Sequence, residues 1–393
     1  MFERFFEKFR GLSVKRRRIA TLDLLRGFLL FAIILDHSPL APRLTDLVSG
    51  GDDLIVSAAE GFFIISGILV GYLYAHKIIL STRSTVRKIW KRAFILYGLS
   101  LATTLLFTFI GLATHDPTSP SHIYRGSFLD ISFWQSLISL EYTYGWADFL
   151  SRYAVFMFFS PICLLLIAIK KSYVLAIASV LLWWISPIIG SQQFTAWQIL
   201  FVFGMIAGSQ LETILDTLKR PRYRLLLRTV VTIFFITSFL SLYVVLIYPF
   251  LRDSHLLPGT LWIPSDQLSD TYNSIGLYFD KETLGAGRII MAGIWFIALF
   301  TIFSKYEKSI QKYTRGMFVF LGKNTLPIYV IHSGVIFFLC LMFTLGSSEG
   351  AAINTLVAII ALLLTLGLSR AYFYLQLKLL HHRTSAGSRP ESE

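Results

Sequence analysis

The feature that most constrains this chain is a succession of long apolar runs. A run of about 20 apolar residues is long enough to cross the hydrocarbon core of a bilayer as a helix. One run, the ninth, is interrupted by Lys323, Asn324 and Pro327, which predicts a break in that helix. The sequence therefore predicts an all-α polytopic membrane protein with about ten transmembrane helices. The runs lie near 20–39, 54–76, 93–113, 149–169, 172–190, 194–210, 226–250, 285–304, 316–343 and 351–377.

Composition excludes the water-soluble and disordered classes. Of the 393 residues, 55% are hydrophobic, 15% are aromatic and only 15% are charged, and the mean hydropathy is +0.64. A soluble domain carries about 25% charged residues, so this chain has too little polar surface to be covered by water. Both cysteines, Cys163 and Cys340, lie inside apolar runs and predict neither a disulfide framework nor a metal site.

Basic residues predict how the chain is oriented. If the N-terminus is cytoplasmic, the inner segments hold 28 Lys and Arg and the outer segments hold 6, with Arg26 and Lys323 inside the runs. This bias follows the positive-inside rule and favours an N-in, C-in topology with an even number of spans. It divides the chain into a basic cytoplasmic segment 1–19, a membrane domain 20–378 and a cytoplasmic tail 379–393. The net charge of +13 then needs no nucleic acid, because anionic lipid attracts such segments.

Two long outer loops, 114–148 and 251–285, combine aromatic and polar side chains. Aromatic faces stack on the C–H faces of sugar rings, and acids and amides bind sugar hydroxyls, so these loops suit a sugar ligand. An interfacial aromatic belt explains the same residues without a ligand. The residues are His122, Tyr124, Trp134, Tyr142 and Trp146 in the first loop, and Trp262, Asp266, Asp270, Tyr272 and Asp280 in the second.

The first apolar run contains ionisable groups that are costly in a membrane, at about 2.5–3.5 kcal/mol for a charge at a helix centre. At about 100° per residue, Arg26 and His37 point within roughly 20° of each other, and they lie about 16 Å apart along the axis. Asp23 lies about 40° to the other side of His37 and is close enough to pair with Arg26. Snorkelling explains Asp23 and Asp36, but Arg26 and His37 on one line, towards the inner and outer leaflets respectively, indicate a functional pair.

The second run carries Glu60 ahead of Gly67 and Gly71. The three share one helix face, because seven and eleven steps each return to within about 20° of the starting direction. The GxxxG spacing predicts the close approach of a neighbouring helix, and Glu60 is then aimed at that neighbour. The alternative is that Glu60 is only a charge at the start of a helix.

Other candidates lie near the ends of later runs. Tyr329 and His332 share a face of the ninth run, where a lone buried histidine is also commonly structural. Arg92 lies at the inner end of the third run, and Lys281 and Arg288 lie at the outer start of the eighth. These cations suit an anionic group, but positive-inside placement or a lipid phosphate explains them equally. The sequence shows no metal-ligand cluster, P-loop, dinucleotide motif or nucleophile elbow.

At these residues the chain resembles the acyltransferase 3 superfamily of integral-membrane enzymes, and most closely its OpgC-type branch. That family's first-helix signature is an Arg and a His separated by ten residues, which Arg26 and His37 reproduce within the typical context of residues 22–27. The branch's second-helix phrase matches residues 58–67. Further matches are residues 147–150 with Tyr153 and Pro161, residues 196–198 with Phe201 and Gly204, Lys281 with Arg288, and residues 322–332.

The resemblance implies acyl transfer across the bacterial inner membrane. An acyl-CoA donor is used from the cytoplasm, and a sugar hydroxyl is modified on the periplasmic side. Members of the branch transfer succinyl groups to periplasmic glucans, whereas other relatives acetylate polysaccharides. No permanently bound cofactor is expected, so the partners are acyl-CoA, a glucan or other polysaccharide acceptor, and membrane lipids.

This resemblance, together with the polar stripe, assigns roles to the candidates. We expect His37 to be the general base on the hydroxyl, held by Asp36 or Glu60, with burial favouring the neutral imidazole. Arg26 is expected to bind or orient the donor. Arg288 or Lys281 is expected to recognise a dicarboxylic acyl group. Asp23 and Arg92 are placed with Arg26 on the donor side, and His332, Tyr329 and Trp146 are placed with Arg288 and Lys281 on the substrate side.

A transporter is the alternative from another functional class. Asp23, Arg26 and His37 would then form a proton and substrate relay for an organic anion. A transporter moves its anion across vesicles without consuming CoA, whereas the enzyme releases CoA only when an acceptor sugar is present. A purely structural scaffold explains neither the polar stripe nor the aromatic outer loops.

Overall fold

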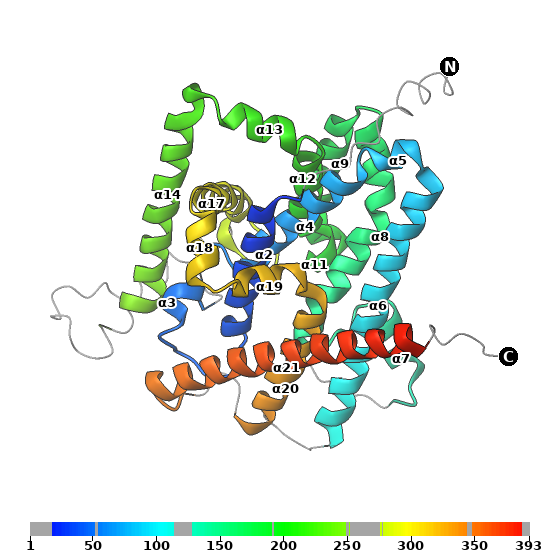
Figure 1. The fold of residues 1–393 in the computed structure, drawn as a ribbon, viewed down its shortest axis with the longest axis vertical. Helices are drawn as coiled ribbons and strands as arrows, with labels where there is room; N and C mark the ends of the chain where they lie inside the picture. The colour runs from blue at the N-terminus through cyan, green and yellow to red at the C-terminus, as the bar shows by residue number, and fades with distance from the viewer. Residues whose placement is uncertain are drawn as a thin grey trace.

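The protein is described here by a computed structural model that covers residues 18–51, 54–113, 128–190, 192–248, 251, 276, 278–343 and 348–386. Every regular element in these ranges is a helix (Figure 1), which confirms the all-α fold class. Most of the basic N-terminal segment, half of the C-terminal tail and large parts of both outer loops lie outside the described residues. The candidates His122, Tyr124, Trp262, Asp266, Asp270 and Tyr272 are among those outside.

Each of the ten apolar runs contains helix. The helices of ten residues or more are α2 (Ala20–Asp36), α4 (Ala58–Tyr74), α6 (Thr82–Ala113), α8 (Asp148–Ala168), α9 (Ser172–Trp184), α12 (Gln198–Ser209), α14 (Arg224–Leu242), α17 (Ala286–Lys305), α20 (Thr325–Met342) and α21 (Ala351–Ala386). Shorter helices connect them: α3 (Asp46–Ser49), α5 (Lys77–Leu80), α7 (Ile131–Ile138), α10 (Ser186–Ile189), α11 (Gln192–Thr195), α13 (Leu211–Leu218), α18 (Glu307–Tyr313) and α19 (Met317–Lys323).

The helices make this a multi-pass membrane protein, but the count of ten spans is not confirmed. Within the described ranges, six helices are long and apolar enough to cross a membrane, and a bent pair, Gln193–Ser209 with Leu211–Leu218, makes up to seven. Helices α2 and α4 have 17 residues each and α9 has 13. A helix of 17 residues is about 25 Å long, somewhat short of a hydrocarbon core of about 30 Å. The exact count and the N-in, C-in topology remain predictions.

The break predicted in the ninth run is present at Asn324, between α19 and α20. The Asn324 side-chain amide donates to the carbonyl oxygen of Phe320 at 3.0 Å, which satisfies one of the free carbonyl groups at the end of α19. Pro327 lies in the first turn of α20, where a missing N–H costs no helical hydrogen bond. The chain can therefore end one helix and start another at this point.

Helices α4 and α12 pack along each other at four glycines. A Cβ atom added at Gly67 or Gly71 would lie 2.0 Å from a backbone carbonyl oxygen of α12. One added at Gly204 or Gly208 would lie 2.4 Å or 2.1 Å from a carbonyl oxygen of α4. The GxxxG prediction is therefore confirmed, with a second Gly-x-x-x-Gly pair on the partner helix.

A similar close contact joins α2 to α19. A Cβ at Gly27 would lie 1.8 Å from the carbonyl oxygen of Phe318, and one at Gly322 would lie 1.8 Å from that of Asp23. Gly27 and Gly322 thereby fix the rotation of α2 against α19. Arg26, which points about 100° away from Gly27 around the helix, contacts Thr325 at the start of α20.

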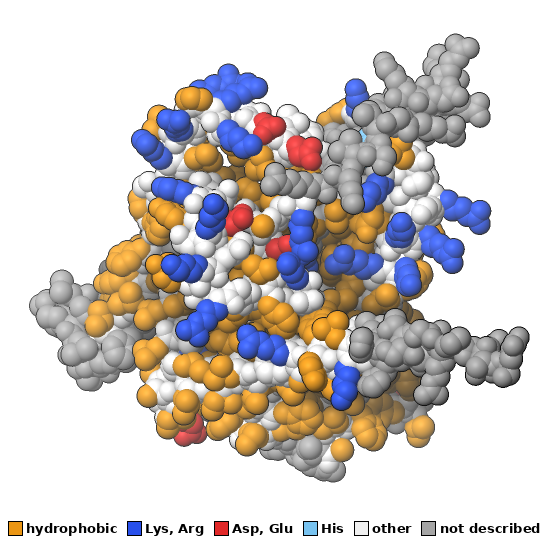
Figure 2. Space-filling view, in the orientation of Figure 1, with side chains coloured by type: hydrophobic (Ala, Val, Ile, Leu, Met, Phe, Trp, Pro, Cys, Tyr) orange, Lys and Arg blue, Asp and Glu red, His pale blue; other side chains and the backbone are white. Residues whose placement is uncertain are grey.

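The outer surface of the bundle is apolar over large areas. Helix α14 lies at the edge of the molecule in Figure 1, and only 6% of its span is buried. In Figure 2, Lys and Arg side chains gather over the upper part of the visible face, and a broad hydrophobic surface covers the lower part. An apolar exterior of this extent is suited to lipid rather than to water.

A glycine substitution tests the α4–α12 contact. Gly71→Ala places its methyl group against backbone that cannot move aside, so we expect a loss of about 1–3 kcal/mol of stability. Gly98→Ala on α6 is the matched control, because its Cβ would meet nothing within 4 Å. Thermal unfolding in detergent should show a lower midpoint for Gly71→Ala only, and equal midpoints would contradict the contact.

Candidate active site

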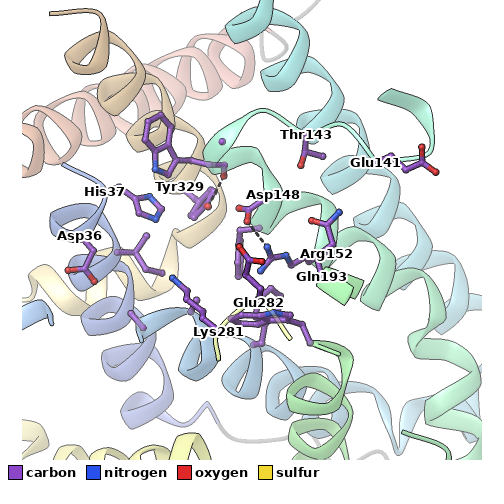
Figure 3. A pocket seen from close by; sticks show the side chains of 18 residues that line it. Asp36, His37, Glu141, Thr143, Asp148, Arg152, Gln193, Lys281, Glu282 and Tyr329 are labelled. Atoms are coloured by element: carbon purple, nitrogen blue, oxygen red, sulfur yellow. Dashed lines mark hydrogen bonds and ion pairs between the residues drawn. The ribbon is translucent and has the colours of Figure 1, made fainter. Parts of the chain in front are cut away.

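A cavity of about 610 Å³ lies among α2, α4, α8 and α20 (Figure 3). Its volume is typical of a small-molecule site, for which about 300–1,000 Å³ is usual. Five of the predicted site residues line this cavity. Two lie at the end of α2, one before α8, one before α17 and one near the start of α20. These are Asp36, His37, Trp146, Lys281 and Tyr329.

His37 lies at the end of α2, where its backbone N–H still donates to Ile33 at 3.1 Å. Its Nδ1 atom is 3.0 Å from Nε2 of His332, and the two rings are stacked with centroids 5.1 Å apart. The ring of Trp146 lies 5.9 Å from His37 on the cavity wall. The sequence singled out both histidines but did not anticipate that they contact each other.

His332 is fully buried and does not line the cavity. Its Nδ1 atom lies 2.8 Å from the carbonyl oxygen of Tyr329, three residues earlier in α20. The Tyr329 hydroxyl donates to the carbonyl oxygen of Trp146 at 2.7 Å. These contacts tie α20 to the turn before α8, and they hold His332 directly behind His37.

Asp36 and Glu60, expected to hold His37, have other partners. Asp36 lines the cavity and accepts a hydrogen bond from the backbone N–H of Gly51 at 3.1 Å. Glu60 is fully buried in the first turn of α4 and forms a capping box with Ser57, whose backbone N–H donates to it at 2.9 Å. Its other carboxylate oxygen accepts from Nε of Arg288 on α17.

Arg288 is buried, and it does not line the cavity. In addition to Glu60, it donates through Nη1 to the carbonyl oxygen of Phe279 at 3.2 Å. It thereby holds the segment before α17, which carries Lys281 and the exposed Glu282 to the cavity. The structure thus places Lys281 at the site and gives Arg288 the position of a buried anchor.

Asp280 stabilises the same segment. Its carboxylate accepts hydrogen bonds from the Thr283 hydroxyl at 2.6 Å and from the Thr283 backbone N–H at 2.7 Å. Partial burial raises the pKa of Asp280, but these hydrogen bonds and the charge of Arg288 outweigh it, so the pKa is lower than usual. Asp280 therefore stays ionised and keeps the turn closed at neutral pH.

Arg26 lies outside the cavity, against Thr325 and Phe62. Its Nη2 atom donates to the Thr325 hydroxyl, and its guanidinium carbon is 5.8 Å from the centroid of the Phe62 ring. Its Nε atom is buried and has no hydrogen-bond partner among the described residues. The expected ion pair with Asp23 is not formed within that part of the chain, because Asp23 pairs with Arg18 at 2.5 Å instead.

Arg92 lies on the same side as Arg26. Its guanidinium carbon is 5.5 Å from the centroid of the Tyr153 ring. The positive charge of Arg92 is close enough to Arg26 to repel it. The rings of Phe62 and Tyr153 both contact Phe149, at 4.9 Å and 6.1 Å between centroids, and Phe149 lines the cavity. These three rings form an aromatic layer between the two arginines and the cavity that contains His37.

Sequence reasoning missed Arg152. This residue lines the cavity from α8, where Nη2 donates to Asp148 at 2.8 Å and the guanidinium carbon lies 4.9 Å from the Trp197 ring centroid. Its Nε atom is buried without a partner in the described ranges. The available signal was the i, i+4 spacing of Asp148 and Arg152 at the start of an apolar run.

Besides its cations, the cavity wall combines carboxylates with aromatic rings (Figure 3). Carboxylates accept hydrogen bonds from hydroxyl groups, and tryptophan faces stack on the C–H faces of sugars, so the wall suits a ligand with many hydroxyls. The carboxylates are those of Asp36, Glu141, Asp148 and Glu282, and the rings are those of Phe63, Trp146, Phe149, Trp197 and Tyr329.

The fold and this cavity define a multi-pass membrane protein with an imidazole at the wall of a polar internal site. Residues 17–376 match the family model described as OpgC protein, so the chain belongs to the OpgC family. Membership implies, in general terms, an acyltransferase that succinylates periplasmic glucans. No curated protein and no solved structure matches the chain.

The Glu60–Arg288 pair leads to a stability prediction. In Glu60→Gln the buried guanidinium loses its counter-charge, and we expect about 3–5 kcal/mol of destabilisation. The double variant Glu60→Gln/Arg288→Met removes both charges and should recover most of this loss. Thermal unfolding in detergent measures both effects. A double variant no more stable than Glu60→Gln would show that the charge pair is not the cause.

Proposed function

We propose that this chain is an O-acyltransferase of the bacterial inner membrane. It transfers an acyl group, succinyl in preference to acetyl, from acyl-CoA to a hydroxyl of a periplasmic glucan. The observation that carries the proposal is the His37 imidazole at the wall of a 610 Å³ cavity lined by carboxylates and aromatic rings. Membership of the OpgC family supports the reaction class.

In this mechanism the acceptor hydroxyl binds in the cavity within reach of His37. The imidazole removes the hydroxyl proton while the sugar oxygen attacks the thioester carbonyl and forms a C–O bond. The tetrahedral intermediate then collapses, the C–S bond breaks, and the CoA thiolate takes the proton back from the imidazolium. The products are the glucan ester and free CoA, with His37 neutral again.

Arg26 and Arg92 are the candidates for donor binding. Both cations lie beyond the aromatic layer of Phe62, Phe149 and Tyr153, and Nε of Arg26 has no protein partner among the described residues. Arginine side chains bind phosphate groups, such as those of CoA, through charge-assisted hydrogen bonds. The acyl end of the donor would pass Phe149 to reach His37.

Lys281 and Arg152 are the candidates for recognising the free carboxylate of a succinyl group. Both line the cavity that contains His37, whereas Arg288 is bound to Glu60 outside it. The preference for succinyl over acetyl rests on these two cations.

Replacing His37 tests the proposed base directly. His37→Ala should lower the rate of glucan acylation by about 10²–10⁴-fold, the usual contribution of general-base catalysis. Mass spectrometry of periplasmic glucans should show the loss while the protein stays in the membrane at its normal level. Wild-type acylation by this variant would end the proposal.

The donor role of Arg26 can be separated from the chemistry. For Arg26→Met we expect KM for acyl-CoA to rise by about 10–150-fold with a smaller change in kcat, because a hydrogen bond to a charged group contributes about 1.5–3 kcal/mol. Release of CoA by purified protein measures it, with Lys312→Met, an exposed cation on α18, as the control. Transport of the acyl anion into vesicles without CoA release would instead favour a transporter.

A further inference from the structure

We infer that His332 is a positioning residue that fixes the tautomer of His37, so that Nε2 of His37 is the nitrogen that accepts the proton. The inference deepens the proposed acyl transfer and rests on it for its catalytic meaning. Its structural basis is the chain of contacts from the Tyr329 carbonyl through His332 to His37.

The first step concerns His332. Its Nδ1 atom lies 2.8 Å from the carbonyl oxygen of Tyr329. A carbonyl oxygen only accepts hydrogen bonds, so Nδ1 of His332 carries the hydrogen. Because a neutral imidazole has a single N–H, Nε2 of His332 is left as an acceptor.

The second step concerns His37. Its Nδ1 atom lies 3.0 Å from that acceptor, so Nδ1 of His37 carries its hydrogen and donates to Nε2 of His332. The lone pair of His37 is then on its own Nε2 atom, the ring nitrogen that His332 does not use. His37 lines the cavity and His332 does not, so the basic nitrogen belongs to the ring that can meet a substrate.

The contact also limits how many protons the pair can hold. If both rings were protonated, two N–H groups would face each other at 3.0 Å. When His37 takes a proton on Nε2, its Nδ1–H becomes part of an imidazolium and donates a stronger hydrogen bond to His332. His332 thus stabilises the charged form of His37 while staying neutral itself.

The surroundings of His332 hold its ring in one orientation. The ring is fully buried, and it bonds to a carbonyl of its own helix, three residues earlier. Tyr329, which supplies that carbonyl, is fixed in turn by its hydroxyl contact with Trp146. A neutral acceptor orients the base without placing another carboxylate in an apolar bundle, where an unpaired charge is costly.

Two amide variants separate this role from a purely structural one. In His332→Gln the side-chain oxygen can occupy the position of Nε2 and accept from His37. In His332→Asn the amide can donate to the Tyr329 carbonyl in place of Nδ1, but no acceptor reaches His37. We expect His332→Gln to acylate glucan within about 10-fold of wild type and His332→Asn to lose at least about 10²-fold, the lower end for a lost base.

A spectroscopic measurement tests the inference without any turnover. The full-length protein, labelled with ¹⁵N-histidine, reports which ring nitrogen of His37 carries hydrogen, and His37→Gln assigns the signals. We expect Nδ1–H with a bare Nε2 in wild type and in His332→Gln, and a mixture of tautomers in His332→Asn.

A wild-type His37 with hydrogen on Nε2 would overturn the inference, as would an unchanged tautomer and equal activity in His332→Asn and His332→Gln. A protein that shows the expected tautomers but releases no CoA from any acyl-CoA with glucan would keep the positioning role and refute the proposed function. The two failures are therefore distinguishable.

Discussion

Much of this structure is determined by the need to give each polar group inside an apolar bundle a polar partner. A charge without a partner in such surroundings costs several kcal/mol, and the buried Glu60 carboxylate meets Arg288 from a helix far along the chain. His37 is likewise met by His332. Each pair joins segments more than 200 residues apart, so the same contacts that offset burial also fix α4 against α17 and α2 against α20. The site is therefore assembled by the interactions that make the polar residues tolerable in a membrane.

Local patterns predicted the features that depend on one helix at a time. The apolar runs all contain helix, the break at Asn324 is present, and Gly67 and Gly71 meet a neighbouring helix as their spacing required. Helical periodicity cannot say which distant segment lies opposite. It therefore gave neither the contact between His37 and His332 nor the partner of Glu60. Arg152 was overlooked for a related reason, since a cation at the start of a run looks like an interfacial charge until the fold places it at a cavity.

The stripe that holds Arg26 and His37 on one side of α2 places these two residues in different surroundings. His37 lines the cavity, and Arg26 lies against Phe62 and Thr325 outside it. Two positions separated by about 16 Å along a helix can be divided by a single layer of side chains, and Phe149 is part of that layer. Close backbone contact of α2 with α19 at Gly27 leaves little freedom for α2 to move relative to it. In the proposed reaction, passage of the donor from Arg26 to the cavity would therefore depend on the aromatic rings more than on movement of α2.

The aromatic layer has a consequence for the cell's energy supply. An enzyme that joins a reactant from inside the cell to one outside needs a route between them, and a permanently wet route lined by imidazoles would also conduct protons. Phe149 contacts the rings of both Phe62 and Tyr153, so a continuous column of water past Phe149 would have to displace apolar rings. In the proposed reaction, the side chains that an incoming thioester has to displace would thus also protect the proton gradient across the membrane between turnovers.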